Sequence, residues 1–380
     1  MIAWTCGTVM QVVQDEESVQ ELTVQTKDER TVTALNYPEL TGRARPGERV
    51  IMNTTAVDLA LASGGKHFVA ARMDEQGRPL IHHEVFGPYG HIMRLRYTPF
   101  QHAVQAVEEE TSAYHEIFRH SASKTLEHIP VIIGETHSML PGFVLSIRHL
   151  MKRAGSKKMP RICYIMSEGG ALPLALSDHV RRLQSLGMLA GTITYGHAFG
   201  GQTECVNLYT ALLAARHVWK ADMIAIMPGP GVVGTGTDLG FSGMEQVAIA
   251  DAAYKLAGRA VLIPRVSAAD PRERHAGISH HTLTVLRFAA STPLTVNLEE
   301  RSPLLAQLEE QSPKHTLVLH DPLAEAEWEE IESPYQMRLT AMGRDSAEEP
   351  LFFAHTYYAA RFAWVEYGKQ KAMQKMDLFG

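Results

Sequence analysis

The chain has 380 residues and a formal net charge of −6, with 45% hydrophobic and 21% charged residues. This length and composition are typical of a globular protein with room for two domains, and they exclude a disordered chain. The sequence has no long stripe of lysine and arginine and no uninterrupted apolar run of about 18 residues, so we expect neither nucleic acid nor a membrane as a partner.

The cysteine count and the amino-terminal sequence bear on the compartment. Three cysteines, Cys6, Cys163 and Cys205, are too few for a disulfide framework, which favours a reducing environment. The first residues, MIAWTCGTVMQVVQ, lack a basic segment followed by an apolar core, so we expect no signal peptide. These features predict a cytoplasmic protein.

Residues 1–106 have the pattern of a small β-rich domain. The segments GTVMQVV, QELTVQT, RTVTALNY and RVIMNTT are short, β-branched and partly alternating, as strands are. Turn sequences such as KDER and ARPGER separate them. Short strands at this spacing predict a small β-barrel or sandwich.

The remainder of the chain has a different hydrophobic pattern. A polar connector is expected over 107–128, and from 129 to 380 apolar runs alternate with helical patterns that carry one apolar stripe. Runs that are apolar on both faces are typical of parallel strands covered by helices. The pattern predicts an α/β domain with a parallel, doubly wound, Rossmann-like sheet. If the aromatic carboxyl-terminal segment formed an eighth unit, the domain would instead be a closed β/α barrel. This barrel is the alternative fold.

In both folds, ligands bind at the carboxyl ends of the parallel strands. The segments that follow the first five predicted strands all carry titratable side chains, and most are rich in glycine, whereas connections at the opposite edge are plainer. We therefore expect the site at the carboxyl edge. The candidates on the first three of these segments are His137, Ser138, Glu168, Gly169, Gly170, His197 and Glu204.

The fourth segment, PGPGVVGTGTDLG, contains a G-x-G-x-x-G pattern formed by Gly229, Gly231 and Gly234. A dinucleotide site would need a helix at the third glycine and an acidic residue about 20 residues later. Neither is convincing, because Ser242 and Glu245 form an S-x-x-E capping box further on and the next strand ends at an arginine. A Walker A loop is excluded because its lysine position holds threonine.

This segment is more than twice as long as an ordinary strand-to-helix connection of about 2–6 residues. Its length and glycine content predict a cradle of backbone N–H groups for an anionic group, with Thr235, Gly236 and Thr237 as further ligands. A plain turn is the alternative.

The fifth segment is the most polar, and a salt-bridged surface loop is its alternative interpretation. Arginine suits carboxylate or phosphate ligands, and histidine suits proton transfer or metal binding. His280 and His281 are adjacent and cannot share a helix face, so we expect at most one to point into the site. The candidates of this segment are Asp270, Arg272, Arg274, His275 and His280.

A metal site would have to combine His197, Glu204 or His137 with His280 or His281. The sequence contains no HExxH motif and no paired CxxC motif, so we expect no metal and only substoichiometric metal in the native protein. No motif assigns a cofactor, which stays unknown.

Several long motifs together are distinctive: NYPELTG, HSMLPG, GHAFGGQTECVNLYTALLAARHV, GPGVVGTGTDLGFSGMEQ and DPRERHAGISHHTLTVL. They resemble those of a bacterial family defined as a domain of unknown function, and the resemblance extends from the first strands to about residue 360. It implies a bacterial protein. It carries no activity, ligand or catalytic residue with it.

The residues favour an enzyme that acts on a small anionic metabolite, carboxylated or phosphorylated. The glycine-rich segment and Arg272 or Arg274 would hold the anion. A metabolite-binding regulatory protein without catalysis and a metal-dependent hydrolase are the alternatives, and a homo-oligomer stays open. General acid–base chemistry is expected from His197, His275 or His280, oriented by Glu168, Glu204 or Asp270.

Overall fold

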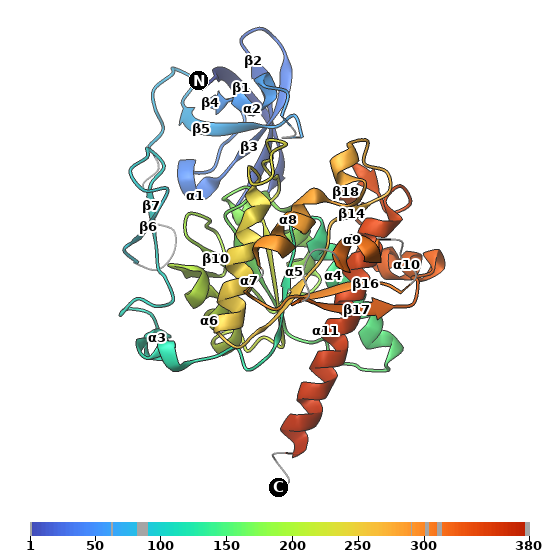
Figure 1. The fold of residues 1–380 in the computed structure, drawn as a ribbon. Helices are drawn as coiled ribbons and strands as arrows, with labels where there is room; N and C mark the ends of the chain where they lie inside the picture. The colour runs from blue at the N-terminus through green and yellow to red at the C-terminus, as the bar shows by residue number, and fades with distance from the viewer. Residues whose placement is uncertain are drawn as a thin grey trace. The chain divides into compact units, whose positions relative to one another are not determined.

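The computed structural model describes residues 2–61, 64–81, 90–289, 291–300, 304–309 and 314–376. The chain divides into two compact units, Met1–Gln105 and Ala106–Gly380, whose elements are labelled in Figure 1. Residues 107–128, expected to form a connector, belong to the second unit, where Val107 and Phe118 are part of the buried core.

The first unit contains a closed barrel of five strands in the order β1-β2-β3-β5-β4, which confirms the predicted β-barrel. Alternate side chains point inward, so that Val9, Leu22, Val24, Val50 and Met52 are buried together. The elements of this unit are β1 (Trp4–Asp15), β2 (Gln20–Thr26), β3 (Thr31–Asn36), α1 (Pro38–Thr41), β4 (Arg49–Asn53), α2 (Thr55–Asp58), β5 (His67–Met73), β6 (Ile92–Arg94) and β7 (His102–Val104).

The second unit is built on an eight-stranded sheet in the order β11-β10-β9-β12-β8-β13-β16-β17. All neighbouring strands pair in parallel, and β9 and β12 are buried along their whole length. The sheet is open, so the doubly wound fold is confirmed and the β/α barrel is not formed. The strands are β8 (Pro130–Ile133), β9 (Ile162–Ser167), β10 (Gly191–Tyr195), β11 (Thr203–Cys205), β12 (Met223–Pro228), β13 (Arg259–Leu262), β16 (Thr295–Glu299) and β17 (Thr316–His320).

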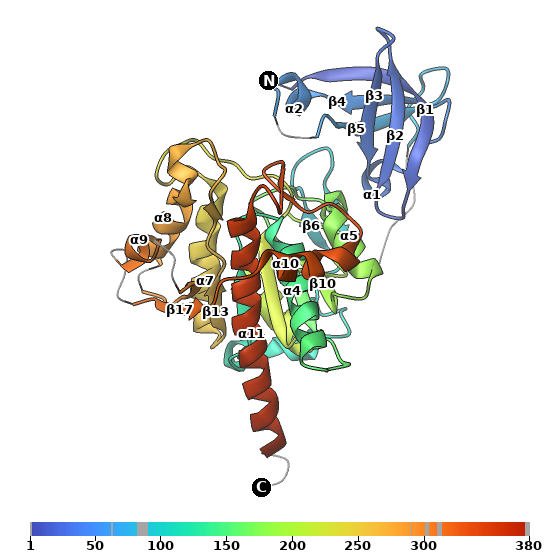
Figure 2. The same ribbon diagram turned by 90° about the vertical axis from the view of Figure 1, so that its right-hand side faces the viewer.

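Helices cover both faces of this sheet. One face packs against α4 (Met139–Arg153), α5 (Asp178–Ser185), α10 (Glu325–Glu332) and α11 (Pro350–Met376). The other face packs against α6 (Leu208–His217), α7 (Glu245–Lys255), α8 (His280–Phe288) and α9 (Leu305–Glu309). Figure 2 shows α4, α10 and α11 together on one side. The aromatic carboxyl-terminal segment is therefore a covering helix and not an eighth unit of a barrel.

Among the described helices, none combines the length and apolar character needed to cross a bilayer. Short elements connect the layers of the second unit. They are α3 (His115–Arg119), η1 (Ser121–Ser123), η2 (Leu174–Leu176), η3 (Ser242–Met244), β14 (Val266–Ser267), η4 (Glu273–His275), β15 (Gly277–Ile278), η5 (Ser333–Tyr335), β18 (Thr340–Ala341) and β19 (Arg344–Asp345).

The strand order creates two switch points at the carboxyl edge. The chain leaves β8 toward β9 and leaves the neighbouring β13 toward β16, in opposite directions across the sheet. It likewise leaves β9 toward β10 and the neighbouring β12 toward β13. Open α/β sheets bind ligands where neighbouring connections diverge in this way, so the segments after these four strands are where a site is expected.

Candidate functional site

An ion pair marks the switch point between β8 and β13. Glu135 lies just after β8 and Arg265 just after β13. Arg265 Nη1 lies 2.9 Å from Glu135 Oε1, and the two side chains are only 4% and 2% exposed. Buried charges are tolerated when they are paired and hydrogen-bonded, so each side chain stabilises the other at the base of the candidate site.

His281 completes this arrangement. Its Nδ1 atom lies 2.6 Å from Glu135 Oε1, and its ring stacks on Phe241 with centroids 3.7 Å apart. Burial by itself would raise the pKa of the Glu135 carboxyl, but the hydrogen bond from His281 and the charge of Arg265 outweigh burial and hold that pKa below its ordinary value. Since an ionised carboxylate only accepts hydrogen bonds, His281 Nδ1 carries the hydrogen and Nε2 is left for other chemistry.

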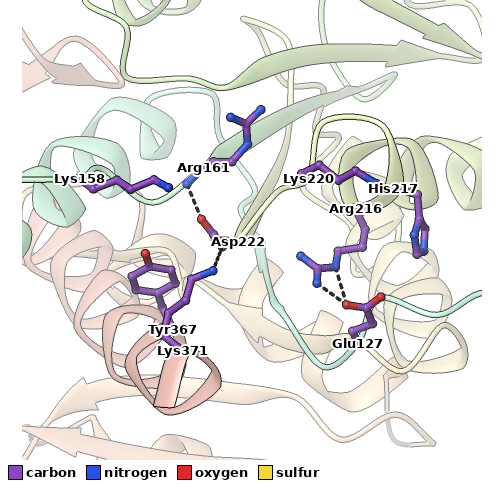
Figure 3. Close-up of a pocket in the computed structure, with 9 residues that line it drawn as sticks. All are labelled: Glu127, Lys158, Arg161, Arg216, His217, Lys220, Asp222, Tyr367 and Lys371. Atoms are coloured by element: carbon purple, nitrogen blue, oxygen red, sulfur yellow. Dashed lines mark hydrogen bonds and ion pairs between the residues drawn. The ribbon is translucent and has the colours of Figure 1, made fainter. Parts of the chain in front are cut away.

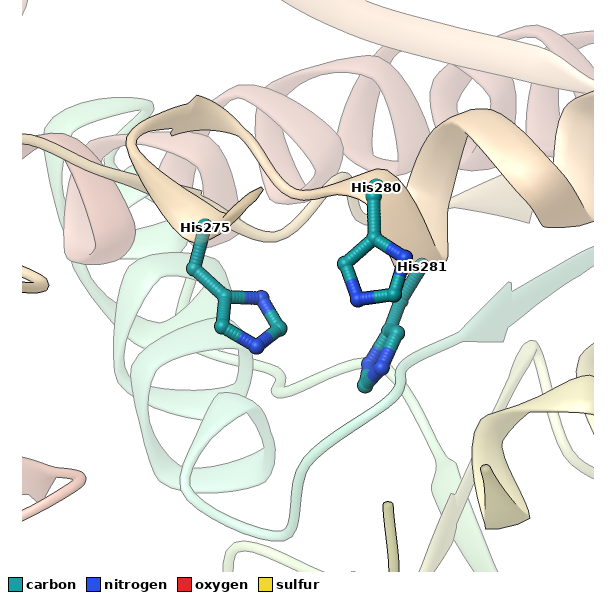
Figure 4. A group of neighbouring side chains, drawn as sticks. All are labelled: His275, His280 and His281. Atoms are coloured by element: carbon teal, nitrogen blue, oxygen red, sulfur yellow. The ribbon is translucent and has the colours of Figure 1, made fainter. Parts of the chain in front are cut away.

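Three imidazole rings converge beside this pair. The ring centroid of His275 lies 5.1 Å from that of His280 and 4.9 Å from that of His281, and the adjacent rings are 4.3 Å apart. Figure 4 shows the rings turned toward a common space. The expectation that at most one of the adjacent histidines points into the site is therefore wrong. Adjacent side chains point in different directions at the start of α8, but the imidazole rings are long enough for their centroids to come within 4.3 Å of each other.

The environment keeps two of these rings neutral. Burial, together with the charges of Arg265 and Arg272, lowers the pKa of His275 to about 3. Burial is also the main cause that lowers the pKa of His280. Neutral imidazole offers a nitrogen lone pair that accepts a proton or binds a metal, so the cluster suits either role at neutral pH.

Asp270 was expected to orient a histidine, and it is instead surrounded by arginines. Its Oδ2 atom lies 2.7 Å from Arg272 Nη2, 3.5 Å from Arg265 Nη2 and 3.6 Å from Arg344 Nη2. Hydrogen bonds from Arg272 are the main cause that holds the pKa of Asp270 far below its ordinary value. The ionised carboxylate thus ties the loop together, and Arg272 is engaged with it.

Arg274 has a different environment from Arg272. It is exposed, and no hydrogen bond or ion pair joins it to another residue in the described part of the chain. Its Cζ atom lies 3.9 Å from where a Cβ atom would stand at Gly236, so the fourth and fifth segments meet here. Of the two candidate arginines, Arg274 is the one available to an anion.

The glycines of the fourth segment have two different roles. A Cβ atom at Gly170 would stand 2.2 Å from Gly229 O and 2.5 Å from Gly231 O, so these glycines allow the segments after β9 and β12 to touch. A Cβ atom at Gly234 would stand 3.7 Å from His281 Cε1 and 3.9 Å from His281 Nε2. Gly234 therefore borders the histidine cluster, and the exposed backbone around it is the part of the segment open to a ligand.

The two threonines of this segment are used within it. Thr235 Oγ1 donates to Gly240 O at 2.9 Å, and Gly240 N donates to Thr237 Oγ1 at 3.1 Å. The two hydroxyl oxygens are 2.9 Å apart. These bonds fold the tip of the segment into a compact turn, so the threonines shape the candidate cradle.

The switch point between β9 and β12 holds a second carboxyl of interest, Glu245. The hydroxyl of Ser167 donates to Glu245 Oε1, so the predicted capping box between Ser242 and Glu245 is not formed, and Ser242 Oγ accepts from Val233 N instead. Burial, reinforced by the nearby charge of Glu168, raises the pKa of Glu245 to about 7. A carboxyl that titrates near neutrality is suited to proton transfer.

The candidates after β10 and β11 lie apart from the histidine cluster. Three strands, β9, β12 and β8, stand between β10 and β13, so the strand ends are separated by about 19 Å. His197 N donates to the Glu168 carboxylate. Glu204 Oε1 accepts from Thr194 Oγ1 at 2.8 Å and from Gly200 N at 2.7 Å. Glu204 therefore shapes its own loop, and His197 belongs with the second switch point.

His137 and Ser138 are placed at the start of α4. His137 is 8% exposed, its Nε2 atom lies 2.5 Å from Ser177 Oγ and its Nδ1 atom 3.1 Å from Pro228 O. Burial lowers the pKa of His137 to about 3. Both ring nitrogens are thus engaged inside the protein. Ser138 stands at the N-cap of α4 without a capping hydrogen bond from its side chain.

Sequence reasoning did not single out several members of these clusters. Glu135 had a usable signal, since it is the first titratable residue after a predicted strand. Arg265 directly follows the fifth predicted strand, and His281 was named without being selected. Glu245 was assigned to a helix cap. The partnerships among these residues join distant parts of the chain and have no local pattern.

A charged cavity of about 310 Å³ lies at the opposite, amino-terminal edge of the sheet, between the start of β9, the end of α6 and α11 (Figure 3). Several of its cations are already paired. Arg216 bonds Glu127, and Lys371 Nζ lies 3.0 Å from Asp222. The cavity also lies away from both switch points. We therefore assign the candidate site to the carboxyl edge.

Comparison with known proteins places the chain in a family. No protein with a curated description is similar to it in sequence. A family model described as protein of unknown function (DUF3866) matches residues 33–360, which spans most of both units and the residues at both switch points. The chain belongs to this family of proteins of unknown function.

Proposed function

We propose that this protein is an enzyme that acts on a small anionic metabolite, carboxylated or phosphorylated, at the carboxyl edge of the sheet. The observation that carries the proposal is the contact between the two long segments after β12 and β13. It places exposed Arg274 and the open glycine backbone next to neutral histidines that are buried or half-buried. A protein that only binds an anion needs the arginine and the open backbone, whereas a proton-transfer enzyme also needs the neutral histidines.

The anion would be held by Arg274 and by backbone N–H groups near Gly234 and Gly236. A guanidinium fork suits planar or tetrahedral oxyanions. Without a bound metal ion, the Glu135–His281 pair resembles an oriented general base, because the carboxylate fixes the tautomer and leaves Nε2 next to the open glycine backbone. Together these groups would bind an anion and exchange a proton with it.

The setting of the protein is also a proposal. The free cysteines Cys163 and Cys205 are buried, which supports a reducing compartment, and we propose the cytoplasm of a bacterium. The partner is the small metabolite, and neither nucleic acid nor a membrane is proposed.

Thermal stabilisation by ligands tests the proposal. Phosphate, sulfate and simple phosphorylated or carboxylated metabolites should raise the melting temperature of the wild type. Arg274→Ala should weaken binding by about 1.5–3 kcal/mol, the scale of a hydrogen bond to a charged group. Lys255→Ala is the matched control, because it removes one exposed positive charge at the far end of α7. Equal stabilisation of all three proteins contradicts the proposal.

Turnover separates an enzyme from a regulatory binding protein. The ligand that stabilises the wild type most is incubated with the protein, and the mixture is followed by mass spectrometry. Conversion that is lost in His281→Gln supports an enzyme. An unchanged ligand with intact, Arg274-dependent binding favours the regulatory alternative.

A further inference from the structure

We propose that His275, His280 and His281 form a binding site for a divalent transition metal ion, zinc being the reference case. One ring nitrogen from each of the three lies within 4.8 Å of those of the other two. The rings enter from two directions, His275 from its loop and the adjacent pair from the start of α8 (Figure 4). The sequence predicted no metal because the spacing H-x4-H-H matches no ligand motif, whereas the fold brings the three together.

The hydrogen bonds around the rings have the pattern of a metal site. His281 Nδ1 is bonded to the Glu135 carboxylate at 2.6 Å, and His275 Nδ1 lies 2.8 Å from Ser279 Oγ. Metal-ligating histidines typically donate one ring N–H to a carboxylate or another oxygen, which fixes the tautomer and presents the other nitrogen to the metal. Both rings therefore have Nε2 available as the ligand atom.

His280 supplies an independent observation. Its Nε2 atom is buried and has no hydrogen-bond partner among the residues that the structure describes. A buried polar atom without a partner destabilises the folded protein. A metal ion shared with the other two rings would give this nitrogen the partner that it lacks.

The geometry requires a small adjustment. Zinc takes nitrogen ligands at about 2.0–2.1 Å in a tetrahedron, which places the ligand nitrogens about 3.3 Å from one another. The ring nitrogens must therefore approach by at most about 1.5 Å from the 4.8 Å limit. Rotation of His280, which is only partly buried, would contribute to this movement without displacing the Glu135–His281 pair.

Three histidines leave the fourth tetrahedral position open, which is typical of catalytic and not of structural zinc. Gly234 borders His281 Nε2 on the side of the open backbone, and Arg274 lies near His280. Resting here on the proposed function, we infer that the anionic ligand occupies the fourth position and contacts Arg274. Its negative charge would offset the metal and the arginines around it.

Metal binding is tested on the full chain without a histidine tag, after dialysis against a chelator. Zinc binding is measured by calorimetry in competition with a chelator, and bound metal by elemental analysis. We expect one zinc per chain, at least tenfold weaker binding in His280→Gln, and about 10–100-fold weaker binding in Glu135→Gln, which removes an outer partner of a ligand. His120→Gln, at an exposed histidine outside the cluster, should bind zinc like the wild type.

Cobalt provides a spectroscopic check in the same proteins. Cobalt bound by three nitrogens in tetrahedral geometry should give visible absorption in the wild type and in His120→Gln, and much weaker absorption in His280→Gln. Circular dichroism verifies that each variant is folded. Less than 0.1 equivalent of zinc in the wild type, or equal affinity in His280→Gln, overturns the metal site.

The metal site and the proposed function fail separately. Phosphate stabilisation is measured with zinc and with chelator present. Arg274-dependent stabilisation in chelator, without zinc binding, refutes the metal site alone. Stoichiometric zinc with no Arg274-dependent anion effect refutes the anion-binding function alone.

Discussion

Replacing Glu135 by glutamine tests the buried charges at the base of the site. Breaking a buried ion pair destabilises a protein by about 3–5 kcal/mol. The amide oxygen of Glu135→Gln still accepts hydrogen bonds from Arg265 and His281, which favours the lower end of this range. Its amide nitrogen takes the place of Oε2, which is buried and has no partner in the described structure. We therefore expect the free energy of unfolding to fall by about 3 kcal/mol.

Urea unfolding followed by tryptophan fluorescence measures this change, because Trp219, Trp328 and Trp364 all lie in the second unit. With a denaturant dependence of about 3 kcal/mol per M, the midpoint should fall by about 1 M. The control is Glu273→Gln, an exposed glutamate of the same loop, which should stay within about 0.5 kcal/mol of the wild type. If the free energy of unfolding of Glu135→Gln also falls by no more than about 0.5 kcal/mol, the buried charges do not have the expected effect.

The pH dependence of the same difference provides a second check. The folded pKa of Glu135 lies below its ordinary value of 4.5. Its contribution to stability is therefore complete above that value and is lost as the pH falls through the folded pKa. The gap between wild type and Glu135→Gln should narrow in acid. A gap that is constant from pH 7 to about pH 3 contradicts the assigned charge state.

Three further predictions concern the loops and the domain boundary. In Gly234→Ala the new Cβ atom meets His281 at an ordinary 3.7 Å, so phosphate should still raise the melting temperature. In Gly234→Val the larger side chain should abolish this effect. Equal shifts of the melting temperature in both variants refute the placement of the anion. Limited proteolysis of the native chain should cut first around the boundary between Gln105 and Ala106, and a first cut inside 129–296 would count against two separate cores. The folded pKa of Glu245, about 7, lies above its ordinary 4.5, so stability falls as the pH rises between these values. Glu245→Gln should therefore melt at a higher temperature than the wild type at pH 8 and not at pH 5, and the same difference at both pH values refutes the raised pKa.

The fold class was predictable because it depends on local patterns. Strands such as β9 and β12 are buried on both faces, and only a sheet covered twice requires apolar runs of that kind. The strand order was not predictable, since the insertion of β12 between β8 and β9 is a long-range pairing. Whether the sheet closes into a barrel could not be predicted either. The aromatic residues of α11 pack against α4 as a helix, but they would also have suited a strand.

The gathering of titratable residues at the carboxyl edge was predictable, because the residues that follow each strand are adjacent in sequence. The contacts within the site were not, because they join distant residues. Glu135 and His281 are 146 positions apart, and Glu245 finds Ser167 across 78 positions. The capping box failed for this reason: a local hydrogen bond was outcompeted by a distant hydroxyl. The His280–His281 prediction failed because it considered only the directions of the two side chains, whereas their ring centroids converge to 4.3 Å.

A crystal structure of the protein grown with phosphate and zinc tests the central claim most directly. The account predicts zinc bound by His275, His280 and His281, and phosphate within hydrogen-bond distance of Arg274 beside the backbone of 234–236. Phosphate found only in the cavity of the opposite edge, beside Lys158 and Lys220, or a carboxyl edge without either ion at saturating concentrations, would contradict it.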